Sequence, residues 1–155
     1  MDYAELTAFQ NYNFEVLVAF DGVSEYAKEK GFYLQEAFVS RGCSVKVSEV
    51  KKRVKKVVNR RSSCQCVAVV CHEQMFKNQA LVASLIAVTS KGVKVCAFLP
   101  ETHDNSWSKE DYFHNAPLEL KHLFDEKQSF IYRFSQYYYE EDEQIAQLYH
   151  AVNAS

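Results

Sequence analysis

Short apolar runs alternate with amphipathic stretches along the chain. The apolar runs have the length of buried strands and end near turn residues. The amphipathic stretches repeat their apolar residues at about 3.6-residue spacing, as helices do. Strands are therefore expected at 14–20, 43–47, 65–71, 93–98 and 129–134. Helices are expected at 24–41, 74–89, 118–124 and 141–152, with a further basic helix whose apolar stripe is Val50, Val54, Val57 and Val58.

The predicted strands and helices follow one another in strict alternation, with short connections between them. This order indicates a parallel sheet covered by helices, because a crossover must carry the chain back before the next parallel strand begins. We expect a three-layer α/β fold: a mostly parallel five-stranded sheet of flavodoxin-like winding, with helices on both faces. A single domain is expected over residues 14–155, after an N-terminal extension at 1–13.

Glycine is scarce, since the 155 residues include only four Gly and two Pro. Phosphate-binding loops of the GxGxxG or GxxxxGK[ST] kind need several glycines close together, so that backbone amides can approach the phosphates. The sequence contains neither motif, which argues against dinucleotide-binding and P-loop enzymes. We accordingly expect no cofactor.

The apolar content also bears on the compartment. No run of 18 apolar residues is present, and residues 1–13 lack the apolar core of a signal peptide. Most of the five cysteines lie inside apolar strand-like runs, where reduced, buried thiols are the natural interpretation. The expected location is the cytoplasm or the nucleus, without membrane insertion.

The net charge of −2 conceals two opposed segments. Residues 46–61 carry eight Lys and Arg and one acid, a net charge of +7, against −9 for the rest of the chain. Such a division suits self-association or a charged protein partner. The expected interaction surfaces are the basic segment, formed by Lys51, Lys52, Arg53, Lys55, Lys56, Arg60 and Arg61, and the acidic cluster, formed by Glu140, Glu141, Asp142 and Glu143.

Asp21 is the first candidate for chemistry, because it ends the first predicted strand. Mg²⁺-dependent nucleases and phosphatases place an Asp there, and they need a second carboxylate beside it. Glu25, Glu73 and Asp104 are the candidates for that second carboxylate. The alternative is that Asp21-Gly22 simply forms a turn.

Cys64-x-Cys66, followed by Cys71-His72, raises the possibility of a zinc site. No second pair of ligands with zinc-site spacing follows, and the remaining histidines are scattered. Burial as small hydrophobic residues explains these cysteines better. We therefore expect no metal site and no catalytic residue.

Residues Phe14–Phe20 resemble the first box of Toll/interleukin-1 receptor (TIR) domains, an apolar strand that opens and closes on an aromatic residue. Residues 57–70 are similar to the helix, turn and apolar strand that follow in that family, and 79–100 and 129–152 resemble its later helix and strands. The likeness to a TIR domain, or to the related SEFIR domain, covers about residues 12–152.

Three departures from the TIR pattern shape what the resemblance implies. Lys46–Val50 leads straight toward the basic helix without the Arg-Asp and Pro-Gly of the second box, and the Phe-Trp of the third box is absent. The region around Ala83-Ser84 has no acid where NAD-cleaving members carry a catalytic Glu. The resemblance therefore implies a non-catalytic adaptor of cytosolic signalling, whose partner is another protein, either TIR-like or a second copy.

A second resemblance covers residues 15–98. Tyr26-Ala27-Lys28 at the first helix, Arg41-Gly42 before the second strand and the Lys-rich helix before the third are similar to the anticodon-binding domain of class II tRNA synthetases. That likeness implies contacts between the basic helix and RNA phosphates. The expected function is thus non-catalytic protein–protein interaction. The alternatives are an anticodon-binding-like module that binds RNA or serves as a coactivator, and an Mg²⁺-dependent nuclease that uses Asp21.

Overall fold

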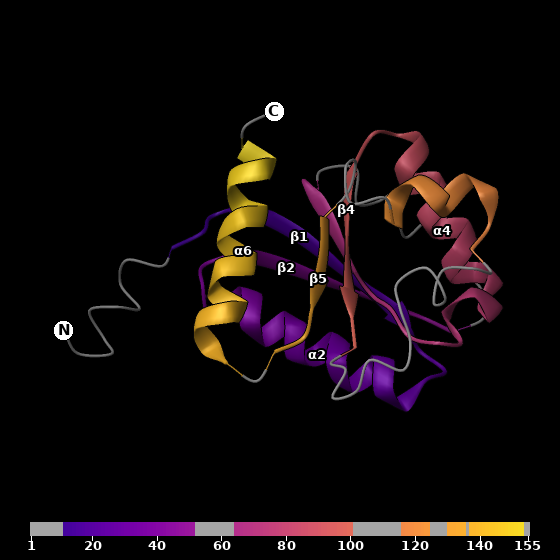
Figure 1. The fold of residues 1–155 in the computed structure, drawn as a ribbon, viewed down its shortest axis with the longest axis horizontal. Helices are drawn as coiled ribbons and strands as arrows, with labels where there is room; N and C mark the ends of the chain where they lie inside the picture. Colours follow the sequence, from indigo (N-terminus) through magenta and orange to yellow (C-terminus); the bar gives the residue numbers. More distant parts are fainter. Residues whose placement is uncertain (1–10, 52–63, 101–115, 125–129, 136, 154–155) are drawn as a thin grey trace.

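The computed structural model describes residues 11–51, 64–100, 116–124, 130–135 and 137–153. In this part of the chain five parallel strands form one sheet in the order β2-β1-β3-β4-β5 (Figure 1), which confirms the α/β fold with flavodoxin-like winding. Among the described residues, no helix is long and apolar enough to cross a membrane. The strands are β1 (Glu15–Asp21), β2 (Ser44–Val50), β3 (Cys66–Val70), β4 (Lys94–Leu99) and β5 (Phe130–Arg133), and the helices are α2 (Glu25–Val39), η1 (Met75–Lys77), α4 (Gln79–Ser90), η2 (Leu118–Phe124) and α6 (Tyr138–Asn153).

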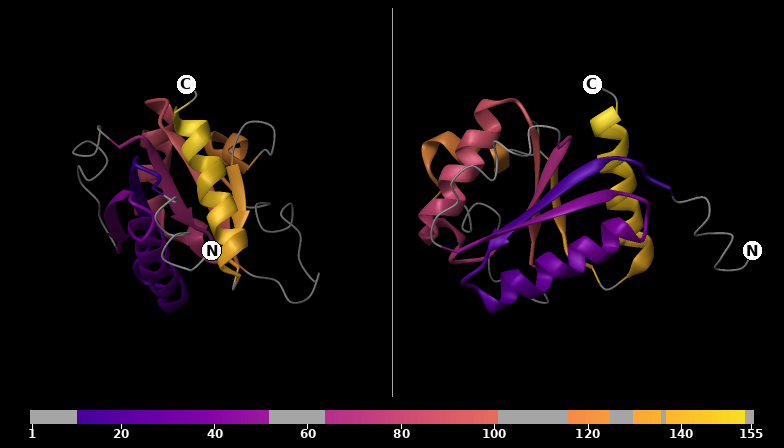
Figure 2. Two further views of the ribbon diagram at one scale, coloured as in Figure 1. Left: turned by 90° about the vertical axis from the view of Figure 1, so that its left-hand side faces the viewer. Right: turned by 180° about the vertical axis from the view of Figure 1, so that it is seen from behind.

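The two faces of the sheet are covered by different helices (Figure 2). Val16, Val18 and Phe20 of β1 pack in one apolar cluster with α2 and α6. Leu17 and Ala19 alternate with them and pack in a second cluster with α4 and η2. Because both faces are buried, the central strands are apolar at every position between their ends instead of at every other one, as parallel sheets require.

The observed β2 corrects one sequence prediction. The strand was expected to end at Val47, with Val50 opening the stripe of a basic helix; instead β2 continues to Val50, which pairs with Asp21 of β1. Val50 is 1% exposed and belongs to the apolar cluster beneath α4. Its burial by the sheet outweighs the helical spacing of the valines that follow. The rest of the predicted basic helix lies outside the described residues.

Helix α4 begins later than the expected residue 74. The chain first makes the short 3₁₀ turn η1, and α4 then starts at Gln79 with Asn78 as its N-cap. The Asn78 Oδ1 accepts the Leu81 N–H at 3.0 Å, which satisfies one amide that the first helical turn would otherwise leave without a partner. With Asn78 as its cap, α4 starts five residues later than expected, and the residues before it form η1 instead of a first helical turn.

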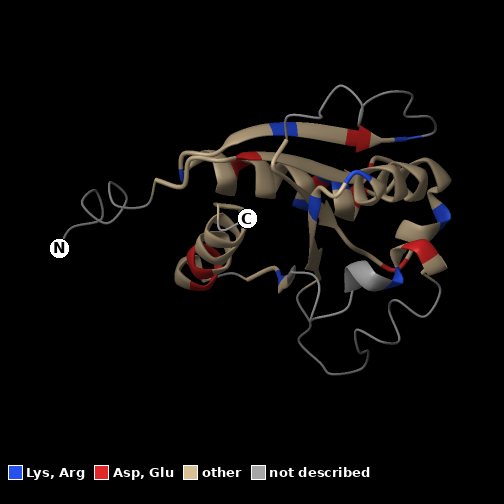
Figure 3. Cartoon of the chain, turned by 90° about the horizontal axis from the view of Figure 1, so that it is seen from above, with Lys and Arg blue, Asp and Glu red and all other residues tan. Residues whose placement is uncertain are grey.

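A buried arginine joins α2 to α6. Arg41 is fully buried, and its guanidinium lies 2.9 Å from carboxylate oxygens of both Glu141 and Asp142. It also donates to the Ala37 carbonyl and lies 4.3 Å from the centre of the Tyr138 ring. The first turns of α6, where acidic residues gather in Figure 3, are thereby fixed against the end of α2.

We predict that removing the two carboxylates costs more stability than removing the arginine. The double variant Glu141→Gln/Asp142→Asn leaves a buried guanidinium without a counter-charge, a change that costs about 3–5 kcal/mol of unfolding free energy. Arg41→Met replaces the charge with an apolar chain, and the two carboxylates that it leaves unpaired reach water better than the arginine does, at 13% and 17% exposure against 0%, so its cost is smaller. Urea denaturation of both variants measures the difference. Equal stabilities of the two variants would contradict this order, and a double variant as stable as wild type would show that the ion pairs contribute no net energy.

Candidate ligand-binding site

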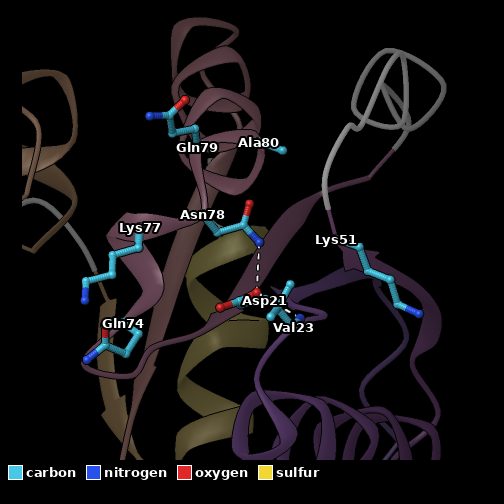
Figure 4. Close-up of a pocket in the computed structure, with 8 residues that line it drawn as sticks. All are labelled: Asp21, Val23, Lys51, Gln74, Lys77, Asn78, Gln79 and Ala80. Carbon is cyan, nitrogen blue, oxygen red and sulfur yellow. Dashed lines mark hydrogen bonds between the residues drawn. The ribbon is translucent and has the colours of Figure 1, made fainter.

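A crevice of about 420 Å³ lies at the carboxyl edge of the sheet. It is bounded by the turn after β1, by the residue after β2 and by the segment that leads from η1 into α4 (Figure 4). Its size falls at the lower end of the range for small-molecule sites. The lining residues are Asp21, Val23, Lys51, Gln74, Lys77, Asn78, Gln79 and Ala80.

The order of the strands explains why a crevice forms here. β1 lies between β2 and β3. The chain leaves β1 through α2 on one face of the sheet and leaves β3 toward α4 on the other face. The two connections diverge, and in open α/β sheets ligands bind in the gap that such a switch point leaves outside the strand ends.

Asn78 holds the walls of this crevice together. Its side-chain amide Nδ2 donates to Asp21 Oδ1 and to the backbone carbonyl of Val50, both at 2.9 Å. Its Oδ1 caps α4, as described above. One side chain thus connects the ends of β1 and β2 to the first turn of α4, and it fixes the position of Asp21 relative to that helix.

Asp21 is buried to 95% but still borders the crevice. Its Oδ1 accepts from the Val23 N–H at 3.0 Å as well as from Asn78. Its Oδ2 lies 3.3 Å from the His72 Nε2. A carboxylate offers about four acceptor positions, so these three neighbours hold Asp21 in place and still leave acceptor capacity toward the crevice.

His72 lies beside Asp21, on its Oδ2 side, and is itself buried. The Gln74 N–H lies 3.4 Å from His72 Nδ1 and can only donate, so Nδ1 is the acceptor and the ring proton belongs on Nε2, facing Asp21. Burial lowers the pKa of His72, and the Asp21 carboxylate offsets that effect only in part. His72 is therefore a neutral positioning group, with both ring nitrogens turned to neighbours in the protein.

Two lysines border the crevice on opposite sides of Asp21 (Figure 4). Lys51 lies 3.7 Å from the Glu49 carboxylate, which also takes Lys28 at 3.7 Å. Lys77 ends η1, and among the described residues it forms no ion pair. The positive charge that remains for a ligand is thus on the side of α4.

The structure describes the expected acidic cluster and one residue of the expected basic segment. Of the basic segment, Lys51 is described, and it lines the crevice; Lys52, Arg53, Lys55, Lys56, Arg60 and Arg61 lie outside the described residues. In the acidic cluster, Glu141 and Asp142 bind Arg41, and Glu140 accepts from the Ser135 hydroxyl. These acids have partners within the fold, and Glu143 is exposed.

The nuclease hypothesis requires carboxylates that converge on Asp21. Among the described residues no group of three or more His, Cys, Asp or Glu side chains could hold a metal ion. The titratable neighbour found beside Asp21 is His72, and the candidate Asp104 lies outside the described residues. Asp21 is placed at the strand end as expected, but in the described part it is a hydrogen-bonding carboxylate.

All five cysteines are buried, and none forms a disulfide. Burial raises the pKa of Cys43 to about 12 and raises the pKa of Cys66, Cys71 and Cys96 as well. Thiols with raised pKa values stay protonated at neutral pH and are poor nucleophiles and metal ligands. The interpretation of the cysteines as small hydrophobic residues agrees with their positions.

Comparison with known proteins gives a structural match only. No family model matches the chain, and no curated protein matches it. The crystal structure of a diflavin flavoprotein A3 from Nostoc sp. is similar, with a TM-score of 0.54 over 92% of this chain and 97% of that one. The two sequences are 10% identical, so the similarity shows a shared fold.

This comparison overturns the expected function. The protein with the similar structure is a flavoprotein, not an adaptor, so the prediction of a non-catalytic TIR-like interaction module is wrong. The prediction that the chain is not an enzyme gains no support from such a neighbour. The resemblances to TIR and anticodon-binding domains, and the partners they imply, stay predictions, because no family model tests them.

The Nostoc protein is a flavoprotein, but the residues around the crevice of this chain do not fit a flavin. Related nucleotide folds hold the phosphate on open amides of the first turn. Here the Gly22 N–H donates to the Val50 carbonyl, and the Val23 and Ser24 amides donate to Asp21. The crevice lining described above includes no aromatic ring to stack on an isoalloxazine. We therefore derive no flavin chemistry.

We predict that His72 makes stability depend on pH. The pKa of His72 in the fold lies below its ordinary value of 6.5, so the unfolded chain binds more protons as the pH falls from 6.5 toward the folded-state pKa. The free energy of unfolding should decrease through that window and be independent of His72 above it. Urea denaturation from pH 5 to 7.5 measures the slope.

The matched control is His72→Gln, which removes the titrating ring from the same buried position. The difference between wild type and variant should change between pH 7.5 and pH 5, with the wild type losing more stability than the variant. A constant difference across this range would show that the His72 pKa is not lowered by burial.

Proposed function

We propose that this protein binds a small phosphorylated ligand in the crevice at the carboxyl edge of its sheet. The observation that carries the proposal is the contrast between the two helices that begin there. α4 starts with Lys77 close before it and has no acid in its first turn. α2 starts beside Asp21 and has Glu25 in its first turn. Among the described residues, Lys77 on the α4 side is the lysine of the crevice that has no carboxylate paired with it, whereas Lys51 has Glu49.

The backbone at the start of α4 adds to the attraction of Lys77. The first amides of an α-helix lack partners inside the helix, and the helix dipole favours negative charge near them. Asn78 takes the Leu81 amide, whereas Gln79 and Ala80 occupy the first turn and line the crevice. Phosphate groups are bound by such combinations of helix amides and a lysine.

The place of the crevice supports the same function. Ligands in open α/β sheets bind at switch points, and the Nostoc neighbour belongs to a class of proteins that bind flavins. Flavin nucleotides are themselves phosphorylated ligands, although the residues here do not fit a flavin ring. The proposal therefore keeps the phosphorylated ligand class and does not extend to the flavin.

We also propose an intracellular location, in the cytoplasm or the nucleus. The support is the set of five buried cysteines without a disulfide. Reduced thiols in this number are usual where glutathione and thioredoxin keep cysteines reduced. A ligand drawn from metabolism would be available in the same compartments.

We predict that Lys77→Gln weakens binding of phosphorylated compounds. Isothermal titration of the wild type with ribose 5-phosphate and with inorganic phosphate should give a Kd below about 1 mM for at least one of them. The loss of a charge-assisted contact worth about 1.5–3 kcal/mol should raise that Kd by about 10- to 100-fold.

The matched control is Lys91→Gln, which removes the same side chain from the opposite end of α4. It should leave the Kd unchanged, and an equal loss in both variants would reveal general screening of charge instead of a site. The proposed function is wrong if the wild type binds neither probe, or if Lys77→Gln binds as the wild type does.

A further inference from the structure

We propose that Asp21 is the residue that selects the ligand, and that it selects a phosphorylated sugar, whether free or as part of a nucleotide. This inference rests on the proposed function and names the class of ligand within it. The buried carboxylate of Asp21 borders the same crevice as Lys77 (Figure 4). Its negative charge makes the part of the crevice beside it unsuited to phosphate.

The carboxylate is rigidly held. Two donors reach its Oδ1, from the Val23 backbone and the Asn78 amide, and the His72 ring lies beside its Oδ2. A group fixed in this way needs little reorganisation when a ligand arrives, which favours discrimination between ligands. Its remaining acceptor positions can only receive hydrogen bonds, so the part of the ligand that contacts Asp21 must carry donors.

Hydroxyl groups suit this position better than an ammonium group does. Lys51, which is paired with Glu49, also borders the crevice, and the His72 N–H faces the Oδ2 of Asp21. The dipole of the His72 N–H offsets part of the negative charge of the carboxylate, which weakens its attraction for a ligand ammonium. Neutral hydroxyls do not depend on that attraction and can still donate to Asp21.

The charges also set the direction in which the ligand lies. The phosphate goes to Lys77 and the start of α4, because the carboxylate of Asp21 repels it from the β1 side. The hydroxyls then point toward Asp21. A sugar phosphate carries these two kinds of group at opposite ends of one small molecule, whereas inorganic phosphate uses only the Lys77 side.

The test compares inorganic phosphate, ribose 5-phosphate and adenosine 5′-monophosphate by isothermal titration against wild type, Asp21→Asn and Lys77→Gln. The Asp21→Asn side chain keeps an oxygen for the Val23 and Asn78 donors. The substitution should raise the Kd for ribose 5-phosphate by about 10- to 100-fold. The Kd for inorganic phosphate should stay unchanged or fall. Lys77→Gln should weaken all ligands that the wild type binds.

The ligand comparison in wild type needs no variant. Ribose 5-phosphate should bind at least about tenfold more tightly than inorganic phosphate, since only the sugar reaches Asp21. Tighter binding of adenosine 5′-monophosphate than of ribose 5-phosphate would identify the nucleotide as the source of the sugar phosphate, and weaker binding would identify the free sugar. Each of these two orders supports the selection of a sugar.

Failure of this inference can be told apart from failure of the proposed function. If Asp21→Asn raises the Kd for inorganic phosphate and the Kd for ribose 5-phosphate by the same factor, Asp21 only shapes the crevice. Its role in selection is then overturned, while the proposal of phosphate binding stands. Equal affinity of the wild type for the two ligands has the same meaning. If no ligand binds to wild type, both proposals are wrong.

Discussion

The hydrogen bonds of the Asn78 side chain fix the start of α4 to the paired ends of β1 and β2, a connection that the sheet does not supply. The amide donates to Asp21 at the end of β1 and to Val50 at the end of β2, and the carbonyl caps α4. Each of these partners comes from a different segment of the chain. Without this connection, the turn after β1 and the start of α4 would be free to move apart, and Lys77 and Asp21 would lose their fixed relation across the crevice.

The burial of the sheet on both faces explains why polar chemistry is concentrated at its edge. The strands supply apolar side chains to two clusters, one beneath α2 and α6 and one beneath α4 and η2. Buried polar side chains are few among the described residues, and two of the four, Asp21 and His72, lie where strands end. Ser48 lies within β2, and Arg41, between α2 and α6, has two carboxylates as partners. A ligand that needs charges and hydrogen bonds therefore meets them at the carboxyl edge.

The pattern of apolar residues was enough to predict the fold, because two-sided burial leaves continuous apolar runs that periodicity detects. The element ends were less predictable. Val50 continues a strand and does not open a helix, because its pairing with Asp21 and its burial depend on residues distant in sequence. The site was predicted only at Asp21, from its place at a strand end. Lys77 gave no signal of its own. Asn78 before an apolar helical run is a recognisable N-cap, but the helix was expected to begin at residue 74. The function inferred from distributed resemblance was wrong.

The two helix starts at the carboxyl edge show how charge decides which of them can receive a phosphate. A helix dipole offers roughly 0.3–1 kcal/mol to an anion at its N-terminus. A phosphate placed about 4 Å from the carboxylate of Asp21 would meet a repulsion of about 4 kcal/mol at an effective dielectric constant of about 20. The start of α2 also has Glu25 in its first turn. The repulsion therefore exceeds the attraction at α2. At α4 the dipole and Lys77 act in the same direction and oppose the repulsion from Asp21, which hydrogen-bonds to the N-cap Asn78. The scarcity of glycine is consistent with this arrangement, because an anion bound by a lysine and a capped helix does not require the glycine-rich turn after β1 on which many nucleotide-binding sheets depend.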